Sequence, residues 1–126
     1  MNVSLEVLLV DDLSNMRRLM KNIIKNLGFK TIHEAGDGKE GLTVLDEQDI
    51  GLIISDWNMP NMTGIEFLKR VRSSEKHKNT PFLMVTAEAT RENIIEAIGA
   101  GASNYVVKPV QADIVEEKLK SILGKT

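Results

Sequence analysis

The segment Val7-Leu8-Leu9-Val10 is a short, unbroken apolar run that stops abruptly at Asp11-Asp12. A continuous run of β-forming apolar residues is typical of a strand that is buried on both faces of a parallel sheet. Apolar side chains then recur at helical spacing over residues 16–27, with Ser14 placed as the N-cap and Gly28 just past the end. This part of the chain therefore predicts one strand followed by one helix.

The same strand-then-helix unit recurs four more times along the chain. Further strands are predicted at Thr31–Ala35, Leu52–Asp56, Phe82–Thr86 and Tyr105–Val107, and a helical apolar pattern follows each of them. Such alternation predicts an α/β fold in which helices cover both faces of a parallel sheet. Five units are too few for an eight-unit barrel, so we expect an open, doubly wound sheet. The units are joined by short turns, and residues 1–126 are expected to form a single domain.

The composition excludes several classes of function. Of the 126 residues 42% are apolar and 27% are charged, as in ordinary globular proteins, and the formal net charge of −2 offers no general field for nucleic acid. The absence of cysteine excludes disulfides, thiolate metal sites and cysteine nucleophiles, and it suits a reducing compartment. Without a leader pattern or an apolar stretch long enough to span a membrane, the sequence predicts a cytoplasmic protein with no membrane partner.

Polar residues follow the predicted strands at equivalent positions. The first strand is followed by Asp11-Asp12, the third ends in Asp56, the fourth ends in Thr86 and the fifth is followed by Lys108. In an open α/β sheet the functional crevice lies at the carboxyl ends of the strands. If these strands are neighbours, three carboxylates, a hydroxyl and an ammonium converge on one edge of the sheet.

This set of groups predicts a particular chemistry. Three neighbouring carboxylates need a counter-charge, and an oxygen-only ligand set suits a hard cation such as Mg²⁺. Zinc is disfavoured, because His33 and His77 lie far from these strand ends in sequence and are interpreted as ordinary surface or turn residues. A cation, a carboxylate, a hydroxyl and a lysine are the groups needed to move a phosphoryl group onto an aspartate, with Lys108 and the metal neutralising its oxygens and Thr86 hydrogen-bonding the product.

Together with their flanking segments, these polar residues resemble the receiver domain of two-component response regulators. The resemblance runs from about Glu6 to Leu123 and is carried by Asp11-Asp12, Ser55-Asp56-Trp57-Asn58-Met59-Pro60, Met84-Val85-Thr86-Ala87-Glu88-Ala89, Glu92-Asn93-Ile94-Ile95, Gly101-Ala102-Ser103 and Tyr105-Val106-Val107-Lys108-Pro109. Within this family the segments are most similar to the single-domain chemotaxis regulators. The resemblance implies a flavodoxin-like fold of five strand–helix units with strand order 2-1-3-4-5.

The resemblance also implies a role for individual residues. Asp56 matches the phosphoacceptor, Asp12 a direct Mg²⁺ ligand and Asp11 a carboxylate that acts mainly through a water, while the backbone carbonyl of Asn58 completes the metal ligands. Such a protein is a phosphoacceptor that assists its own phosphorylation and dephosphorylation rather than an enzyme acting on other molecules.

Further positions match groups around the phosphoryl site. Thr86, Lys108 and the backbone N–H of Ala87 match its contacts, and Asn58 and Glu88 stand where such proteins tune self-dephosphorylation. The Lys108-Pro109 peptide matches one that is cis in the family.

The family implies an output surface and partners. Phosphorylation would draw Thr86 inward and bury Tyr105, and the remodelled face would include Glu88, Ala89, Val107 and Lys118. The implied partners are a chemotaxis histidine kinase, a flagellar motor switch protein and a phosphatase, with the chain acting as a monomer.

Several positions and alternatives stay open. Leu13, Asn15 and Val110 depart from the chemotaxis pattern, and Val110 removes bulk beside the output face, so a paralogue that serves as a phosphate sink or relay without motor binding is the first alternative. A Mg²⁺-dependent hydrolase with an aspartyl-phosphate intermediate is the second, and an FMN protein of the same topology is the third. The basic cluster on the first predicted helix is interpreted as a solvated face or a kinase contact, and consists of Arg17, Arg18 and Lys21.

Overall fold

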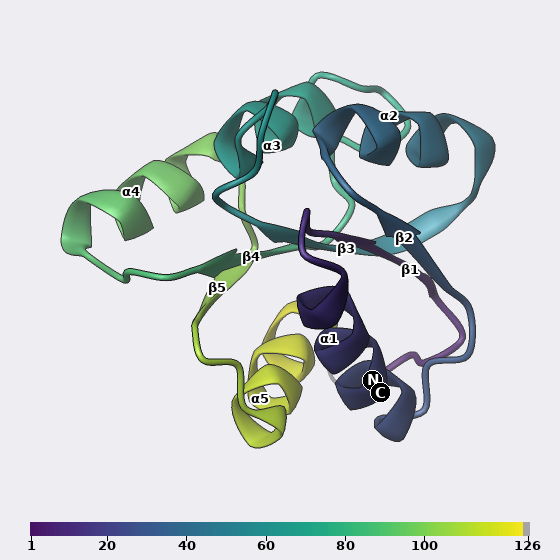
Figure 1. Cartoon of the computed structure of the whole chain (residues 1–126). Coiled ribbons are helices and arrows are strands. Elements are labelled where there is room, and N and C mark those ends of the chain that lie inside the picture. The colour runs from purple at the N-terminus through teal and green to yellow at the C-terminus, as the bar shows by residue number, and fades with distance from the viewer. Residues whose placement is uncertain (125–126) are drawn as a thin grey trace.

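A computed structural model describes residues 1–124. Its strands are β1 (Glu6–Val10), β2 (Ile32–Ala35), β3 (Ile50–Asp56), β4 (Phe82–Thr86) and β5 (Asn104–Val107). They form one parallel sheet in the order β2-β1-β3-β4-β5 (Figure 1). The predicted doubly wound, flavodoxin-like sheet is confirmed, and β4 has the bounds that the sequence predicts.

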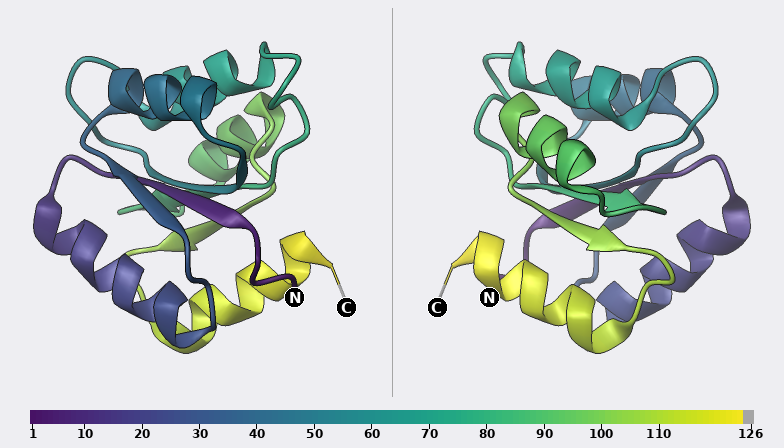
Figure 2. Two further views of the ribbon diagram at one scale, coloured as in Figure 1. Left: turned by 90° about the vertical axis from the view of Figure 1, so that its right-hand side faces the viewer. Right: turned by 90° about the vertical axis from the view of Figure 1, so that its left-hand side faces the viewer.

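The helices alternate with the strands and lie on both faces of the sheet. They are α1 (Ser14–Asn26), α2 (Gly38–Glu47), α3 (Gly64–Arg72), α4 (Arg91–Ala100) and α5 (Ala112–Leu123). Helices α1 and α5 lie on one face, and α2, α3 and α4 lie on the other (Figures 1 and 2). None of the helices within residues 1–124 is both long and apolar enough to cross a bilayer.

Two apolar cores result from this arrangement, one on each face of the sheet. Successive residues of β1 alternate between them, since Leu8 and Val10 face the α2/α3/α4 side while Val7 and Leu9 face the α1/α5 side. Phe67 of α3 and Phe82 of β4 fill the first core with ring centroids 5.8 Å apart. Burial on both faces explains why the central strands are continuous apolar runs.

Side-chain caps fix where most helices begin. Asp37 accepts from the Glu40 N–H at 2.9 Å before α2, and Thr63 forms a capping box with Glu66 before α3. The prediction that Ser14 caps α1 is wrong, because Ser14 lies inside the helix and Leu13 is the extended N-cap without a side-chain bond. Gly28 follows α1 with φ +111°, a left-handed conformation that glycine adopts without steric cost.

Candidate functional site

The parallel register brings the ends of four strands to one edge of the sheet. Val10 pairs with Ser55, Asp56 pairs with Val85, and Thr86 pairs with Val107. The residues that follow or end these strands are therefore neighbours, although up to about a hundred positions separate them in sequence. This edge is the one at which ligands bind in doubly wound sheets.

Three carboxylates meet at this edge, as the sequence predicts. Each of Asp11, Asp12 and Asp56 offers an oxygen within 4.8 Å of the other two. Asp56 is 5% exposed and Asp11 is 9% exposed, whereas Asp12 is open to solvent. The donor set is all oxygen, so it fits a hard cation such as Mg²⁺, which takes one or two carboxylates and retains waters. The exposed side of Asp12 is where such waters would have room.

The electrostatics of the cluster favour a cation. Burial raises the pKa of Asp11 and the charges of Asp56 and Asp12 raise it further, while the Leu13 N–H and the Lys108 ammonium act in the opposite direction. The Nζ of Lys108 lies 3.0 Å from Oδ1 of Asp56 and is the counter-charge of the cluster. The cis peptide expected between Lys108 and Pro109 is present.

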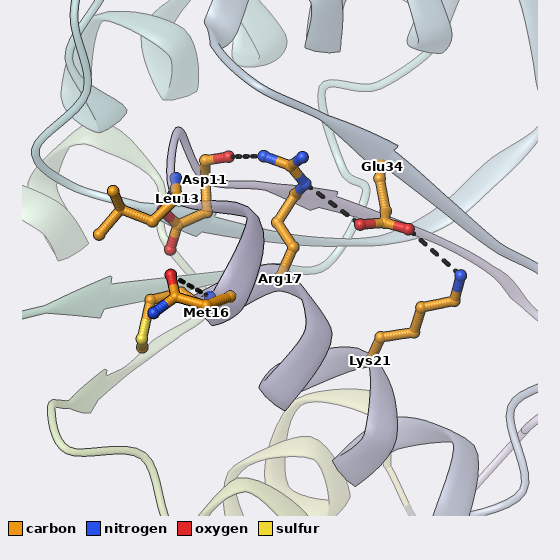
Figure 3. A network of polar contacts seen from close by, with 7 residues as sticks. Asp11, Leu13, Met16, Arg17, Lys21 and Glu34 are labelled. Atoms are coloured by element: carbon orange, nitrogen blue, oxygen red, sulfur yellow. Dashed lines mark hydrogen bonds and ion pairs between the residues drawn. The ribbon is translucent and has the colours of Figure 1, made fainter.

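The loop that carries the acidic pair is held at three points. The Asp11 N–H donates to the Ala35 carbonyl of β2 at 3.1 Å, and its Oδ1 accepts from the Leu13 N–H at 2.9 Å. Its backbone carbonyl accepts from the guanidinium of Arg17, which also donates to Oε1 of Glu34 at 3.1 Å (Figure 3). Sequence reasoning missed this role and treated Arg17 as part of a solvated basic face. No periodic pattern could have revealed it, because Glu34 lies on a separate strand.

The Thr86 hydroxyl is engaged within its own loop. It donates to the Glu88 carbonyl at 2.9 Å, and the Glu88 N–H lies 3.2 Å from it. The amide of Asn93, in the first turn of α4, donates to the same carbonyl at 3.2 Å. Thr86 lines a hollow beside the acidic cluster together with Trp57, Asn58, Ala87, Glu88 and Asn93. The structure thus places Thr86 and Ala87, two of the residues predicted to contact the phosphoryl group, around one opening, while Lys108 lies against Asp56.

The residues predicted for the output face lie mostly along a second groove. Tyr105 and Val107 of β5 line it with Lys118 of α5, and the Lys118 Nζ lies 4.9 Å from the centroid of the Tyr105 ring. Tyr105 is half-buried and Val107 is 38% exposed. Glu88 and Ala89 are exposed in the loop between β4 and α4 and do not line this groove.

The two histidines lie away from the acidic edge. His33 is a half-exposed residue of β2 whose Nε2 lies 2.9 Å from Glu6 Oε1. His77 lies in a turn, as expected, but the prediction that it is a surface residue is wrong. It is 3% exposed, because its ring bonds Thr80 at 2.9 Å and the Leu45 carbonyl at 3.2 Å. The first contact lies within the turn that precedes β4, and the second joins this turn to α2.

Comparison with known proteins gives a consistent picture. The family described as the response regulator receiver domain matches residues 7–120. Chemotaxis protein CheY-3 of Vibrio cholerae is 48% identical over 99% of this chain and 96% of its own length. The solved structure of CheY4 of Vibrio cholerae superposes with a TM-score of 0.89 at 35% identity, covering 94% of this chain and 98% of that one.

A more distant structure shares the fold alone. It is the receiver domain of a sensor histidine kinase of Pseudomonas aeruginosa, solved with a magnesium ion in its active-site cleft. It has a TM-score of 0.86 at 22% identity, and the alignment covers 97% of this chain and 99% of that one.

Proposed function

Because this chain belongs to the response regulator receiver domain family and is a chemotaxis CheY-like member of it, we propose that it is a phosphorylation-controlled switch for flagellar rotation. It would accept a phosphoryl group on Asp56 from a chemotaxis histidine kinase and present an altered surface to the flagellar motor switch. The observation that carries this proposal is the buried Asp56 carboxylate, which lies 3.0 Å from Lys108 and within 4.8 Å of two further carboxylates. The whole chain would act as one monomeric cytoplasmic domain.

The transfer needs no separate base, because the nucleophile would be a carboxylate oxygen of Asp56 rather than a hydroxyl. One of its oxygens forms a bond to phosphorus while the bond from phosphorus to the kinase histidine nitrogen breaks, and that nitrogen keeps the electron pair. Asp11, Asp12, Asp56 and the Asn58 carbonyl would hold Mg²⁺, which when bound neutralises charge on the phosphoryl oxygens. The receiver family binds Mg²⁺ at an acidic pocket, and this chain has the acidic cluster for it.

Three groups of this chain would stabilise the new phosphoryl oxygens. Lys108 would exchange its carboxylate partner for a phosphoryl oxygen, and the Ala87 N–H would donate to another. The Thr86 hydroxyl would leave the Glu88 carbonyl and donate to the phosphoryl group. Asn58 and Glu88, at the mouth of the hollow, would control the access of the water that later hydrolyses the acyl phosphate.

The output would follow from the movement of Thr86. Its departure frees space behind β4 into which Tyr105 could turn, and this would reshape the groove that Val107 and Lys118 line. The Lys118 ammonium, now 4.9 Å from the ring centroid, would lose its aromatic partner. The change is a population shift between two packings that the phosphoryl charge biases. Ala89 lies in the loop that joins Thr86 to α4, so it would move with the switch.

Phosphorylation is tested with Trp57 as the reporter, because it lines the same hollow as Thr86. Mg²⁺ is added first, followed by acetyl phosphate, and fluorescence is recorded for the wild type, Asp56→Asn and Asp46→Asn. The last variant removes the same charge at an exposed position of α2 and is the matched control. We expect a donor-dependent change that decays in the wild type and in Asp46→Asn and is missing in Asp56→Asn. An unchanged response of Asp56→Asn would contradict the proposal.

A second candidate function is a phosphate sink or relay that does not bind the motor. The observation that favours it is Val110, which is small where chemotaxis regulators commonly carry phenylalanine and which lines the pocket behind Asp56. Capture of the chain by a motor-switch peptide, with and without a phosphoryl mimic on Asp56, separates the two. Equal capture in both states would favour the sink. The hydrolase alternative is not proposed, since receiver domains are signalling proteins.

A further inference from the structure

Arg17 is joined to the acidic edge through the backbone. Its side chain is 19% exposed, and its guanidinium donates to the carbonyl of Asp11 and to the Glu34 carboxylate. Lys21 holds the other oxygen of Glu34 at 3.2 Å (Figure 3). Hydrogen bonds from both cations hold the pKa of Glu34 below its usual value, although burial alone would raise it. The guanidinium is therefore fixed between β2 and the loop after β1.

The carbonyl that Arg17 holds belongs to the peptide group between Asp11 and Asp12. A peptide group is planar, so fixing its oxygen fixes the peptide plane and with it the position of the Cα of Asp12. The bond from the Leu13 N–H to Asp11 Oδ1 spans Asp12 and restrains its φ and ψ, so the two contacts together orient the Cα–Cβ bond of Asp12. Helix α1 has no side-chain cap that could orient this loop instead. The N–H of Asp11 is held by Ala35 and its carboxylate by the Leu13 N–H. Asp12 is exposed, and Arg17 is the group that restrains the peptide in front of it.

We infer that Arg17, anchored by Glu34, is a positioning residue that aims the carboxylate of Asp12 at the divalent cation. The inference rests on the Mg²⁺ site of the proposed function. It goes beyond that function because Arg17 would touch neither the metal nor the phosphoryl group. Outer partners that orient metal ligands affect affinity strongly even without contacting the ion.

A positioning role and a simple charge effect of Arg17 predict opposite changes in Mg²⁺ affinity when the residue is replaced. A cation near the site repels Mg²⁺, so removing the charge of Arg17 would tighten Mg²⁺ binding if charge were its only role. If Arg17 positions Asp12, its removal weakens binding despite the lost repulsion. Methionine is the suitable replacement, because Arg17 also lines the pocket behind Asp56 and methionine keeps an unbranched apolar side chain there.

The test is the Kd for Mg²⁺, followed by Trp57 fluorescence without a phosphoryl donor. Arg17→Met is compared with Arg18→Met, which removes the same charge from the neighbouring exposed residue of α1. We expect the Kd to rise about tenfold in Arg17→Met and to fall slightly, by less than about twofold, in Arg18→Met. Equal or tighter binding in Arg17→Met than in Arg18→Met would overturn the inference.

A second test of the inference changes Glu34 and leaves Arg17 in place. Glu34→Ala removes its anchor and should raise the Kd several-fold, whereas Glu34→Gln keeps an oxygen for the Arg17 Nε–H and should restore near-normal binding. Binding that is normal in both variants would overturn the role of the anchor.

The amide signal of Asp12 in Mg²⁺-free NMR spectra should move in Arg17→Met and not in Arg18→Met. A loss of global stability would not produce this difference. If the wild type itself gave no Mg²⁺ response, the metal site and this inference would both fail, whereas a normal wild type with unaffected variants refutes the inference alone.

Discussion

Replacing Asp11 with asparagine should stabilise the fold in the absence of a divalent cation. Asparagine has nearly the same shape and keeps the oxygen that accepts from the Leu13 N–H at 2.9 Å, while it removes one charge. That charge belongs to a group of three carboxylates whose oxygens lie within 4.8 Å of one another. The substitution therefore removes both the cost of burying the Asp11 charge and its repulsion by the two other carboxylates.

The size of the effect follows from the distances and the burial. At 4.8 Å and an effective dielectric constant of ~20, the repulsion between Asp11 and the buried Asp56 is ~3.5 kcal/mol. Asp12 is exposed, and a water-like dielectric gives only ~0.9 kcal/mol for its repulsion of Asp11. Attraction between Asp11 and the Lys108 ammonium offsets part of this repulsion. We expect a net gain of about 2 kcal/mol, which corresponds to a rise in Tm of about 7 °C for a domain of this size.

The assay is thermal and urea unfolding in EDTA at neutral pH, with Asp46→Asn as the control that removes an exposed carboxylate. Saturating Mg²⁺ should reverse the order, because the wild type then gains the free energy of binding and Asp11→Asn gains less of it. An unchanged or lower Tm of Asp11→Asn in EDTA would refute the reasoning. So would a gain of the same size in Asp46→Asn.

The pH dependence gives an independent check. Burial is the main cause that raises the pKa of Asp11 in the folded protein above its unfolded value. Protonation therefore favours the folded state, and this stability is fully present below the unfolded pKa of about 4 and is lost as the pH rises through the folded value. The advantage of Asp11→Asn should be complete at neutral pH and should shrink as the pH falls towards about 4. An advantage that does not change with pH would show that it has another cause.

Three further changes have expected outcomes. Thr63→Ala removes the capping box of α3 and should lower the free energy of unfolding by about 1 kcal/mol in urea titrations; no loss would mean that the cap is not needed. Gly64→Ala would place a Cβ 2.4 Å from the Asp56 carbonyl oxygen. Because backbone must then move, we expect a loss of about 2 kcal/mol or more in the same assay, and a neutral effect would contradict this close packing. Lys108→Met removes the ammonium that lies 3.0 Å from Asp56, so fluorescence titration should show Mg²⁺ binding about tenfold more tightly, and weaker binding would be the contrary result.

The fold was predictable because its signals are local and repeated. The apolar runs of β1, β3 and β4 mark strands buried on both faces, whereas the edge strands β2 and β5 are only partly buried and give weaker signals. The bounds of β4 were predicted to the residue, and Pro81 stands directly before it. The gathering of Asp11, Asp12, Asp56, Thr86 and Lys108 follows from parallel strands alone, since their carboxyl ends share an edge.

What sequence reasoning missed consists of hydrogen bonds between polar side chains and backbone groups. Ser14 looked like a cap, but α1 already includes it and follows Leu13, and the loop before the helix is held by the short-range bond from the Leu13 N–H to Asp11. His77 looked exposed, but its ring reaches the Leu45 carbonyl 32 residues away. Arg17 looked solvated for the same reason, since its carbonyl partner is visible only in three dimensions. Hydrophobic periodicity indicates which face of a helix or strand is apolar. It does not indicate which polar side chain hydrogen-bonds a given backbone oxygen.

The Glu88 carbonyl has two donors, and this lowers the free-energy cost of moving the Thr86 hydroxyl away from it. A polar group left without a partner away from water costs about 1–3 kcal/mol, enough to hold a two-state equilibrium strongly to one side. Here Asn93 continues to donate to that oxygen at 3.2 Å after the threonine hydroxyl turns away. The resting and rearranged loops then differ mainly by the two bonds that the Thr86 hydroxyl makes with the carbonyl and the N–H of Glu88. A single phosphoryl group on Asp56 would shift such a closely balanced equilibrium. Hydrolysis of the acyl phosphate would return the loop to its resting state.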